Sequence, residues 1–251
     1  MFLKTPGRRL ERRACVAALL SAALVSACGQ TAEPGTRPPA AEHAPAPAPV
    51  ARAAVSARPK LVVLGDSLTA GLGLPKDEAY PTILQQRLDA AGFDYEVVNA
   101  GVSGDTSAGG LSRLDWALEG DVRVLIVALG GNDALRALPT DELKQNLSQI
   151  IERAQARHIE VVLAGMDAPR NFGRDYIVAF HQVYPSLARQ YHVALVPFLL
   201  EGVAAVPALN QRDGIHPTAE GARIVADNVW TVLKPVVDKQ RQTRKEGPAG
   251  S

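Results

Sequence analysis

The chain has 251 residues, 47% of them hydrophobic, and a formal net charge of +1 at pH 7. This length suits one globular domain with additional sequence at its ends. Because the charge is nearly balanced, the composition gives no indication of a nucleic-acid partner or of electrostatic binding to an anionic membrane.

The first 28 residues have the pattern of an export signal. Basic residues between Lys4 and Arg13 precede a short apolar segment, residues 15–25. That segment is shorter than the roughly 20 apolar residues that cross a bilayer. It ends in Val25-Ser26-Ala27-Cys28, which resembles a bacterial lipobox, where the cysteine is lipidated and becomes the first mature residue. We therefore expect a membrane partner through a lipid anchor on Cys28; the alternative is an ordinary signal peptide.

The segment after the lipobox is expected to be a tether. Residues 29–58 are rich in Ala and Pro and have no apolar periodicity, which favours an extended chain. Gly29 resembles the sorting signal of outer-membrane lipoproteins, so the expected location is the periplasm of the cell envelope, with a lipid anchor in the outer membrane. Both cysteines precede residue 29, so the remaining chain has no disulfide, thiolate nucleophile or cysteine metal site.

The folded domain is expected over residues 59–237, followed by a polar tail over residues 238–251. Apolar runs predict strands over 60–64, 95–98, 122–129, 159–164 and 193–197. Helical spacing predicts helices over 80–91, 111–118, 140–157, 176–191 and 218–235, with Thr140 as an N-cap. Strands that are apolar throughout and alternate with helices indicate a parallel sheet covered on both faces. The expected fold class is α/β: a three-layer α/β/α, doubly wound domain with five parallel strands.

Four polar clusters follow these strands. Ser67, Gly104 and Asn132 lie just beyond the first, second and third strands, and Asp213 and His216 follow the fifth after an irregular loop. Sites in such sheets form beyond the carboxyl ends of the strands, so we expect these residues to meet at one edge. They supply a nucleophile, a base, a carboxylate and hydrogen-bond donors, which is the residue set of serine-based acyl transfer.

In this order the clusters resemble the motif blocks of the SGNH, or GDSL, hydrolase family. The likeness is closest to its bacterial acyl-CoA thioesterase, arylesterase and lysophospholipase members. The matching segments are Leu64–Gly71, Asn99–Ser107, Leu129–Asp133, Asn171–Tyr176 and Asp213–Pro217. The resemblance implies a flavodoxin-like arrangement, no cofactor, and a small acyl ester or thioester as substrate.

The resemblance also implies a role for each site residue. Ser67 matches the nucleophile, His216 the general base and Asp213 the residue that orients it. The backbone amides of Ser67 and Gly104 and the side-chain amide of Asn132 match the oxyanion donors. Ser67 by itself would more often be a helix cap, and we expect its neighbour Asp66 to have a structural role.

The acyl pocket is expected at the loop after the fourth strand. Its expected apolar contacts are Leu72, Leu74, Met166, Ala168 and Phe172. Arg170 either meets an anionic group at the mouth or is solvated and paired with Asp167. Two alternatives stay open: an esterase that removes acetyl groups from carbohydrate or peptidoglycan, and a non-catalytic binding lipoprotein. No His-Glu-x-x-His motif is present, so we do not expect metal catalysis.

Overall fold

The computed structural model describes residues 58–246. The expected export signal, the lipidation site at Cys28 and the tether up to residue 57 lie outside the described residues. No helix within residues 58–246 is both long and apolar enough to cross a membrane.

A five-stranded parallel sheet forms the centre of the domain. Its strands are β1 (Lys60–Gly65), β2 (Glu96–Gly101), β3 (Val122–Ala128), β4 (Glu160–Ala164) and β5 (Ala194–Val196), in the order β2-β1-β3-β4-β5. All neighbouring strands are parallel. The central strands β1 and β3 are buried along almost their whole length, which explains why their sequences are apolar on both faces. The predicted five-stranded parallel sheet is confirmed.

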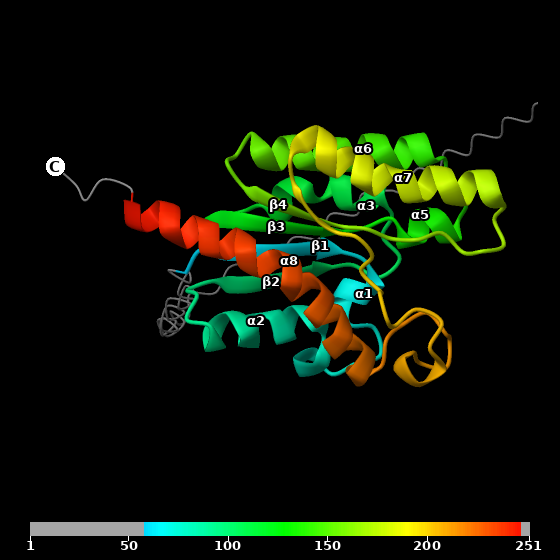
Figure 1. Ribbon diagram of the computed structural model, residues 1–251, viewed down its shortest axis with the longest axis horizontal. Coiled ribbons are helices and arrows are strands. Elements are labelled where there is room, and N and C mark those ends of the chain that lie inside the picture. The colour runs from blue at the N-terminus through cyan, green and yellow to red at the C-terminus, as the bar shows by residue number, and fades with distance from the viewer. Residues whose placement is uncertain (1–57, 247–251) are drawn as a thin grey trace, which may run out of the picture. The chain divides into compact units, whose positions relative to one another are not determined.

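Helices cover both faces of the sheet, so the three-layer architecture is also confirmed. Figure 1 shows α2 and α8 on one face and α3, α6 and α7 on the other. The helices are α1 (Ser67–Ala70), η1 (Lys76–Glu78), α2 (Tyr80–Ala90), α3 (Ser107–Ser112), α4 (Leu114–Ala117), α5 (Gly131–Leu135), α6 (Thr140–Gln155), α7 (Arg174–Tyr191), η2 (Pro207–Leu209) and α8 (Ala219–Glu246).

The last helix is longer than predicted. We expected it to end near Pro235 and the chain to continue as a polar tail from residue 238, but α8 runs through the proline to Glu246. Val225, Val229, Leu233 and Val237 are four residues apart, and each is almost completely buried. This apolar stripe continues on both sides of Pro235, so core packing outweighs the loss of one backbone hydrogen bond.

Two smaller predictions were also wrong. The single helix expected over residues 111–118 is two short helices, α3 and α4, with Arg113 between them. Thr140 is the first residue of α6 and not its cap; Pro139 occupies the N-cap position without a side-chain hydrogen bond. A proline is well suited to a helix start because its missing N–H has no partner there.

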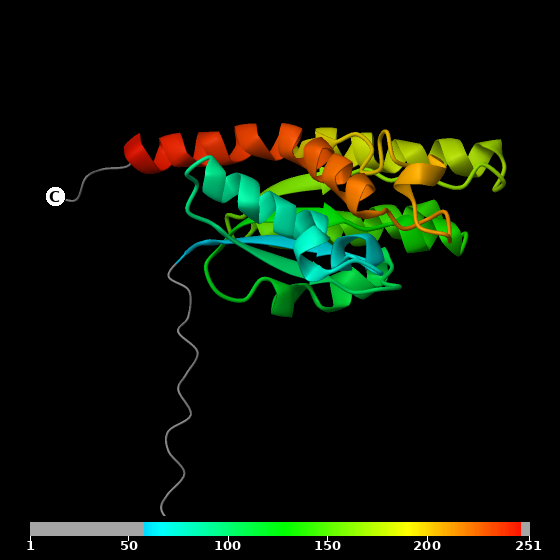
Figure 2. The same ribbon diagram turned by 90° about the horizontal axis from the view of Figure 1, so that it is seen from below.

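The topology brings the polar clusters together. The chain order reverses between β1 and β3, which makes the carboxyl edge of these two strands the switch point of the sheet. Figure 2 shows α1, which follows β1, and the loop before α8 at the same end of the sheet, with the start of β1 at the opposite end. Residues far apart in the sequence therefore share one edge.

Candidate active site

Ser67 is presented by a tight turn between β1 and α1. Asp66 is the N-cap of α1, and its Oδ1 accepts a hydrogen bond from the Leu68 amide at 3.0 Å. Ser67 is thus the first helical residue and not the cap, so its hydroxyl is free of the capping role. The turn needs a glycine at position 65, because a Cβ there would lie 2.0 Å from Thr69 Oγ1.

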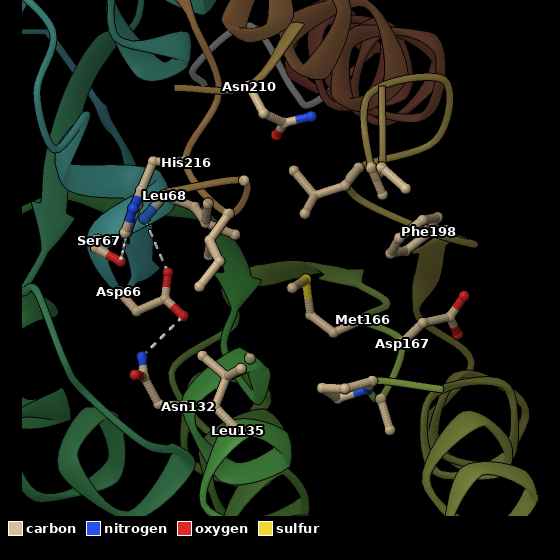
Figure 3. Close-up of a pocket in the computed structure, with 18 of the residues that line it drawn as sticks. Asp66, Ser67, Leu68, Asn132, Leu135, Met166, Asp167, Phe198, Asn210 and His216 are labelled. Atoms are coloured by element: carbon tan, nitrogen blue, oxygen red, sulfur yellow. Dashed lines mark hydrogen bonds between the residues drawn. The ribbon is translucent and has the colours of Figure 1, made fainter. Parts of the chain in front are cut away.

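A chain of hydrogen bonds joins Ser67 to two residues near the C-terminus. His216 Nε2 lies 2.9 Å from Ser67 Oγ, and His216 Nδ1 lies 2.8 Å from Asp213 Oδ2 (Figure 3 shows the Ser67 and His216 side chains meeting). The His216 side chain is only 16% exposed. The structure therefore brings together the three residues predicted to form a catalytic triad.

The Asp213 carboxylate is organised by its own loop. Its Oδ1 accepts hydrogen bonds from the amides of Ile215 at 2.9 Å and His216 at 3.0 Å. These amides, together with the bond to the His216 side chain, lower the pKa of Asp213 to about 2. Asp213 is therefore ionised at neutral pH and accepts the proton of Nδ1. This fixes the tautomer in which Nε2 is unprotonated and can accept the Ser67 hydroxyl proton.

The three residues expected to donate hydrogen bonds to the oxyanion, Ser67, Gly104 and Asn132, line the same pocket. Gly104 has a φ of +85°, a left-handed conformation that glycine adopts without strain, and its carbonyl accepts a hydrogen bond from Arg136 Nη2 at 2.8 Å. Within residues 58–246 the Gly104 amide donates no hydrogen bond. The Ser67 amide lies in the first turn of α1, where backbone N–H groups have no partner inside the helix. Asn132 is anchored through Nδ2, which donates to the Asp105 carbonyl at 2.9 Å.

Asp66 also contacts Asn132, which the sequence did not predict. The Asp66 side chain is buried, and its Oδ2 accepts a hydrogen bond from Asn132 Nδ2 at 3.3 Å (Figure 3). Burial raises the pKa of Asp66 to about 6, although the bonds from Leu68 and Asn132 and the nearby His216 act in the opposite direction. Asp66 has the structural role that we expected, since it caps α1, and it also links the nucleophile turn to the Asn132 side chain.

A fully buried contact between Ser107 and Asp133 joins the segment after β2 to the segment after β3. The Asp133 carboxylate accepts hydrogen bonds from the Ser107 amide at 2.8 Å and the Ser107 hydroxyl at 2.5 Å. Asn146 of α6 donates to the same hydroxyl at 3.0 Å. Nothing in the local sequence pattern identified Ser107 or Asn146 as partners of Asp133.

An arginine braces the turn that carries Ser67. Arg113 donates from Nε to Asp105 Oδ2 at 2.6 Å and from Nη2 to the Gly65 carbonyl at 2.9 Å. Because Arg113 lies between α3 and α4, the helix break that the sequence did not predict is what positions this side chain.

Ser67, His216 and Asn132 line one side of a pocket with a volume of about 970 Å³. This volume is at the upper end of the range typical of small-molecule sites. The apolar side chains that line it include Leu68, Leu72, Leu135, Met166, Ala168, Ile177, Val178, Phe198 and Leu200. Polar catalytic groups at one side of a largely apolar pocket suit a substrate with a reactive polar group and an apolar chain.

The structure places three of the five expected acyl-binding residues in this pocket. Leu72, Met166 and Ala168 line it. Leu74 instead lines a smaller hollow that Ser67 and His216 also line, and the Phe172 ring packs against Tyr176 with their centroids 5.8 Å apart. Leu74 and Phe172 therefore lie outside the pocket lining.

One contact between charged residues of the same loop differs from expectation. Arg170 lines the pocket, but Asp167 is paired with His181 and not with Arg170, at 2.8 Å between Asp167 Oδ1 and His181 Nδ1. Across the described residues, no group of three or more His, Cys, Asp or Glu side chains is arranged to hold a metal ion.

Comparison with known proteins identifies the family. Residues 63–224 match the GDSL-like Lipase/Acylhydrolase family. The chain is 46% identical over 178 residues to Esterase TesA of Pseudomonas aeruginosa, covering 70% of this chain and 89% of that protein. It is 39% identical over 179 residues to Thioesterase 1/protease 1/lysophospholipase L1 of Escherichia coli K12, covering 71% and 85%. The crystal structure of TesA superposes with a TM-score of 0.68, covering 70% of this chain and 98% of that one. The chain therefore belongs to the GDSL-like lipase/acylhydrolase family.

Proposed function

We propose that this protein hydrolyses carboxylic esters and thioesters through an acyl-serine intermediate. One observation carries the proposal: Asp213, His216 and Ser67 form a continuous chain of hydrogen bonds that ends at a pocket with mainly apolar walls. A serine hydroxyl becomes a useful nucleophile only when a base accepts its proton, and His216 is within hydrogen-bond distance to do so.

In the first half of the reaction, Ser67 Oγ attacks the carbonyl carbon of the substrate and its proton passes to His216 Nε2. The ionised Asp213 stabilises the imidazolium that results. Negative charge develops on the carbonyl oxygen, where the amides of Ser67 and Gly104 and the Asn132 side chain are the proposed donors. Since Asn132 Nδ2 also contacts Asp66 at 3.3 Å, this weak bond would be exchanged for one to the oxyanion.

In the second half, the alcohol or thiol leaves with the proton from His216, and the acyl group remains on Ser67. A water molecule then gives a proton to His216 and attacks the acyl-serine carbonyl, which releases the carboxylic acid and restores the hydroxyl. Both halves use the same base and the same donors, so no metal or cofactor is needed for the balance of the reaction.

The proposed substrates are aryl and acyl esters, acyl-CoA thioesters and lysophospholipids. Two features support this class. Relatives that match most of this chain bear the names esterase, arylesterase, thioesterase and lysophospholipase. Leu68, Met166 and Phe198 are among the residues that line the pocket, so a longer acyl chain can bury more methylenes there than an acetyl group can.

A substrate panel tests the proposal. We expect purified protein to hydrolyse p-nitrophenyl butyrate, an acyl-CoA or a lysophospholipid, with a Ser67→Ala chain as the blank. kcat/KM should rise from acetate toward medium-chain esters. A steady decline from acetate onward, together with efficient turnover of acetylated sugars, would replace this proposal by a carbohydrate esterase. Specific binding of these compounds without any turnover would indicate a binding protein.

We also propose that the mature protein is a lipoprotein of the cell envelope, anchored through Cys28. The lipobox-like Val25-Ser26-Ala27-Cys28 and the Pro-rich residues 29–58 support this. In a Gram-negative host, the wild-type protein should fractionate with membranes, and Cys28→Ser should be released or processed differently. Wild-type protein found entirely in the soluble envelope fraction would contradict the anchor.

A further inference from the structure

The pocket has a polar pair at the side opposite the nucleophile. Figure 3 shows Asp167 and Phe198 across the pocket from Ser67, with Met166 between them. The Asp167 carboxylate does not point to the nucleophile but is bonded to His181 of α7, with 2.8 Å between Oδ1 and Nδ1. Asp167 and His181 both line the pocket, and neither takes part in the reaction derived above.

The face of helix α7 that lines the pocket is apolar on one turn and polar on the next. Ile177 and Val178 line it on one turn, and His181 and Gln182 line it on the next. Residues four apart lie above one another on a helix, about 6 Å apart along the axis. The wall formed by this helix therefore passes from apolar to polar within one turn.

We propose that the Asp167–His181 pair is the specificity element that sets the longest acyl chain the pocket accepts. This inference rests on the proposed esterase function and deepens it. An acyl chain bound at Ser67 extends along Leu68, Met166 and Phe198, where each methylene loses contact with water.

Beyond those side chains the next methylene meets the hydrogen-bonded carboxylate and imidazole. About half of each of these two side chains is exposed, 46% for Asp167 and 55% for His181, so both keep water as a partner when the pocket is empty. A methylene that displaces this water offers no hydrogen bond in return. The increase of about fourfold in binding for each buried methylene therefore ends at the pair.

The partial exposure of the pair makes the proposal testable by substitution. A hydrogen bond between two half-exposed side chains contributes little to folding, so replacing both partners should leave the fold intact. The double variant Asp167→Leu/His181→Leu makes this side apolar, and Asp167→Asn/His181→Gln keeps it polar with similar shape. Gln190→Leu adds the same apolar side chain to an exposed position of α7 outside the pocket lining.

The experiment measures kcat/KM of the full chain for p-nitrophenyl esters from acetate to dodecanoate, below their micellar concentrations. In the wild type, kcat/KM should rise by up to about fourfold per methylene and then level off or fall. The double-leucine variant should move this break to chains at least two methylenes longer. The polar double variant and Gln190→Leu should keep the wild-type break, and circular dichroism should match for all four proteins.

Two results would overturn this inference and leave the proposed function standing. In one, the chain length at which kcat/KM stops rising is the same in the double-leucine variant as in the wild type. In the other, the polar variant moves it as far as the double-leucine variant does. If the wild type hydrolyses none of the esters, the proposed function fails, and the inference fails with it.

Discussion

His216 Nε2 lies 2.9 Å from Ser67 Oγ, although 149 positions separate the two residues in the chain. The contact exists because β1 ends at Gly65, two residues before Ser67, and because the loop that follows β5 and η2 returns across the carboxyl edge of the sheet. The covalent chain contributes little to this proximity. Core packing holds the two ends of the domain together, so the geometry of the base depends on the whole fold.

Asn132 is expected to stabilise charge in the transition state. Asn132→Ala removes one oxyanion donor, which should lower kcat by about 10²–10³-fold while KM changes much less. Steady-state kinetics on p-nitrophenyl butyrate measures the effects on kcat and KM separately. An effect carried mainly by KM would show that Asn132 binds the ground state and not the oxyanion.

Asp213 is expected to act through the orientation of His216. Asp213→Asn offers an amide to Nδ1 and permits the wrong imidazole tautomer, so kcat should fall by several orders of magnitude. Because the pKa of Asp213 is lowered to about 2, its protonation cannot explain a loss of activity between pH 4 and 7. The pH profile of kcat/KM for wild type and Asp213→Asn measures both effects. If the maximum kcat/KM of Asp213→Asn equals that of the wild type, Asp213 does not orient His216.

The buried Asp66 should make stability depend on pH. Its pKa is raised from 3.8 to about 6 in the folded state, so between these values the native protein binds more protons than the unfolded chain. Stability associated with Asp66 is therefore present at low pH and lost as the pH rises through about 6.

Asp66→Asn removes this titration and keeps a side chain that can cap α1. The unfolding free energy of the variant relative to the wild type should increase between pH 4 and pH 8, by up to about 3 kcal/mol at 1.36 kcal/mol per pKa unit. Urea unfolding of both proteins at the two pH values measures the difference. A difference that is the same at both values would show that Asp66 does not titrate in this range.

The Ser107–Asp133 contact should stabilise the fold. Asp133→Ala leaves the buried Ser107 amide and hydroxyl without this partner, which should cost about 2–4 kcal/mol. Asp77→Ala, at an exposed position, is the matched control and should change stability by less than about 0.5 kcal/mol. Equal unfolding midpoints for the two variants would contradict the bracing role.

The sequence predicted the sheet and the reacting groups because both depend on local patterns. Apolar runs such as residues 122–129 marked the strands. Polar motifs marked Ser67 and Asn132 just after strands and His216 after a longer loop, and the family resemblance implied their roles. The path of a loop depends on packing that no local pattern encodes. For this reason Phe172 turned out to pack on Tyr176, and Leu74 to lie outside the pocket.

Long-range partners were beyond the sequence for the same reason. Asp66 and Asn132 come from different strand ends, and their contact depends on the spacing of β1 and β3. The helix through Pro235 was missed because the local penalty of proline was visible, whereas the buried stripe that outweighs it was not.

The most direct test of Ser67 as the nucleophile is the activity of Ser67→Ala on p-nitrophenyl butyrate, compared with wild type at equal concentration. The Ser67 hydroxyl is hydrogen-bonded to His216, and the cap of α1 is Asp66 and not Ser67. Removing the Ser67 hydroxyl should therefore leave the fold unchanged. We expect a loss of at least about 10³-fold in kcat/KM with an unaltered circular dichroism spectrum and unfolding midpoint. A folded Ser67→Ala protein that keeps turnover within about tenfold of wild type would contradict the assignment of Ser67 as the nucleophile.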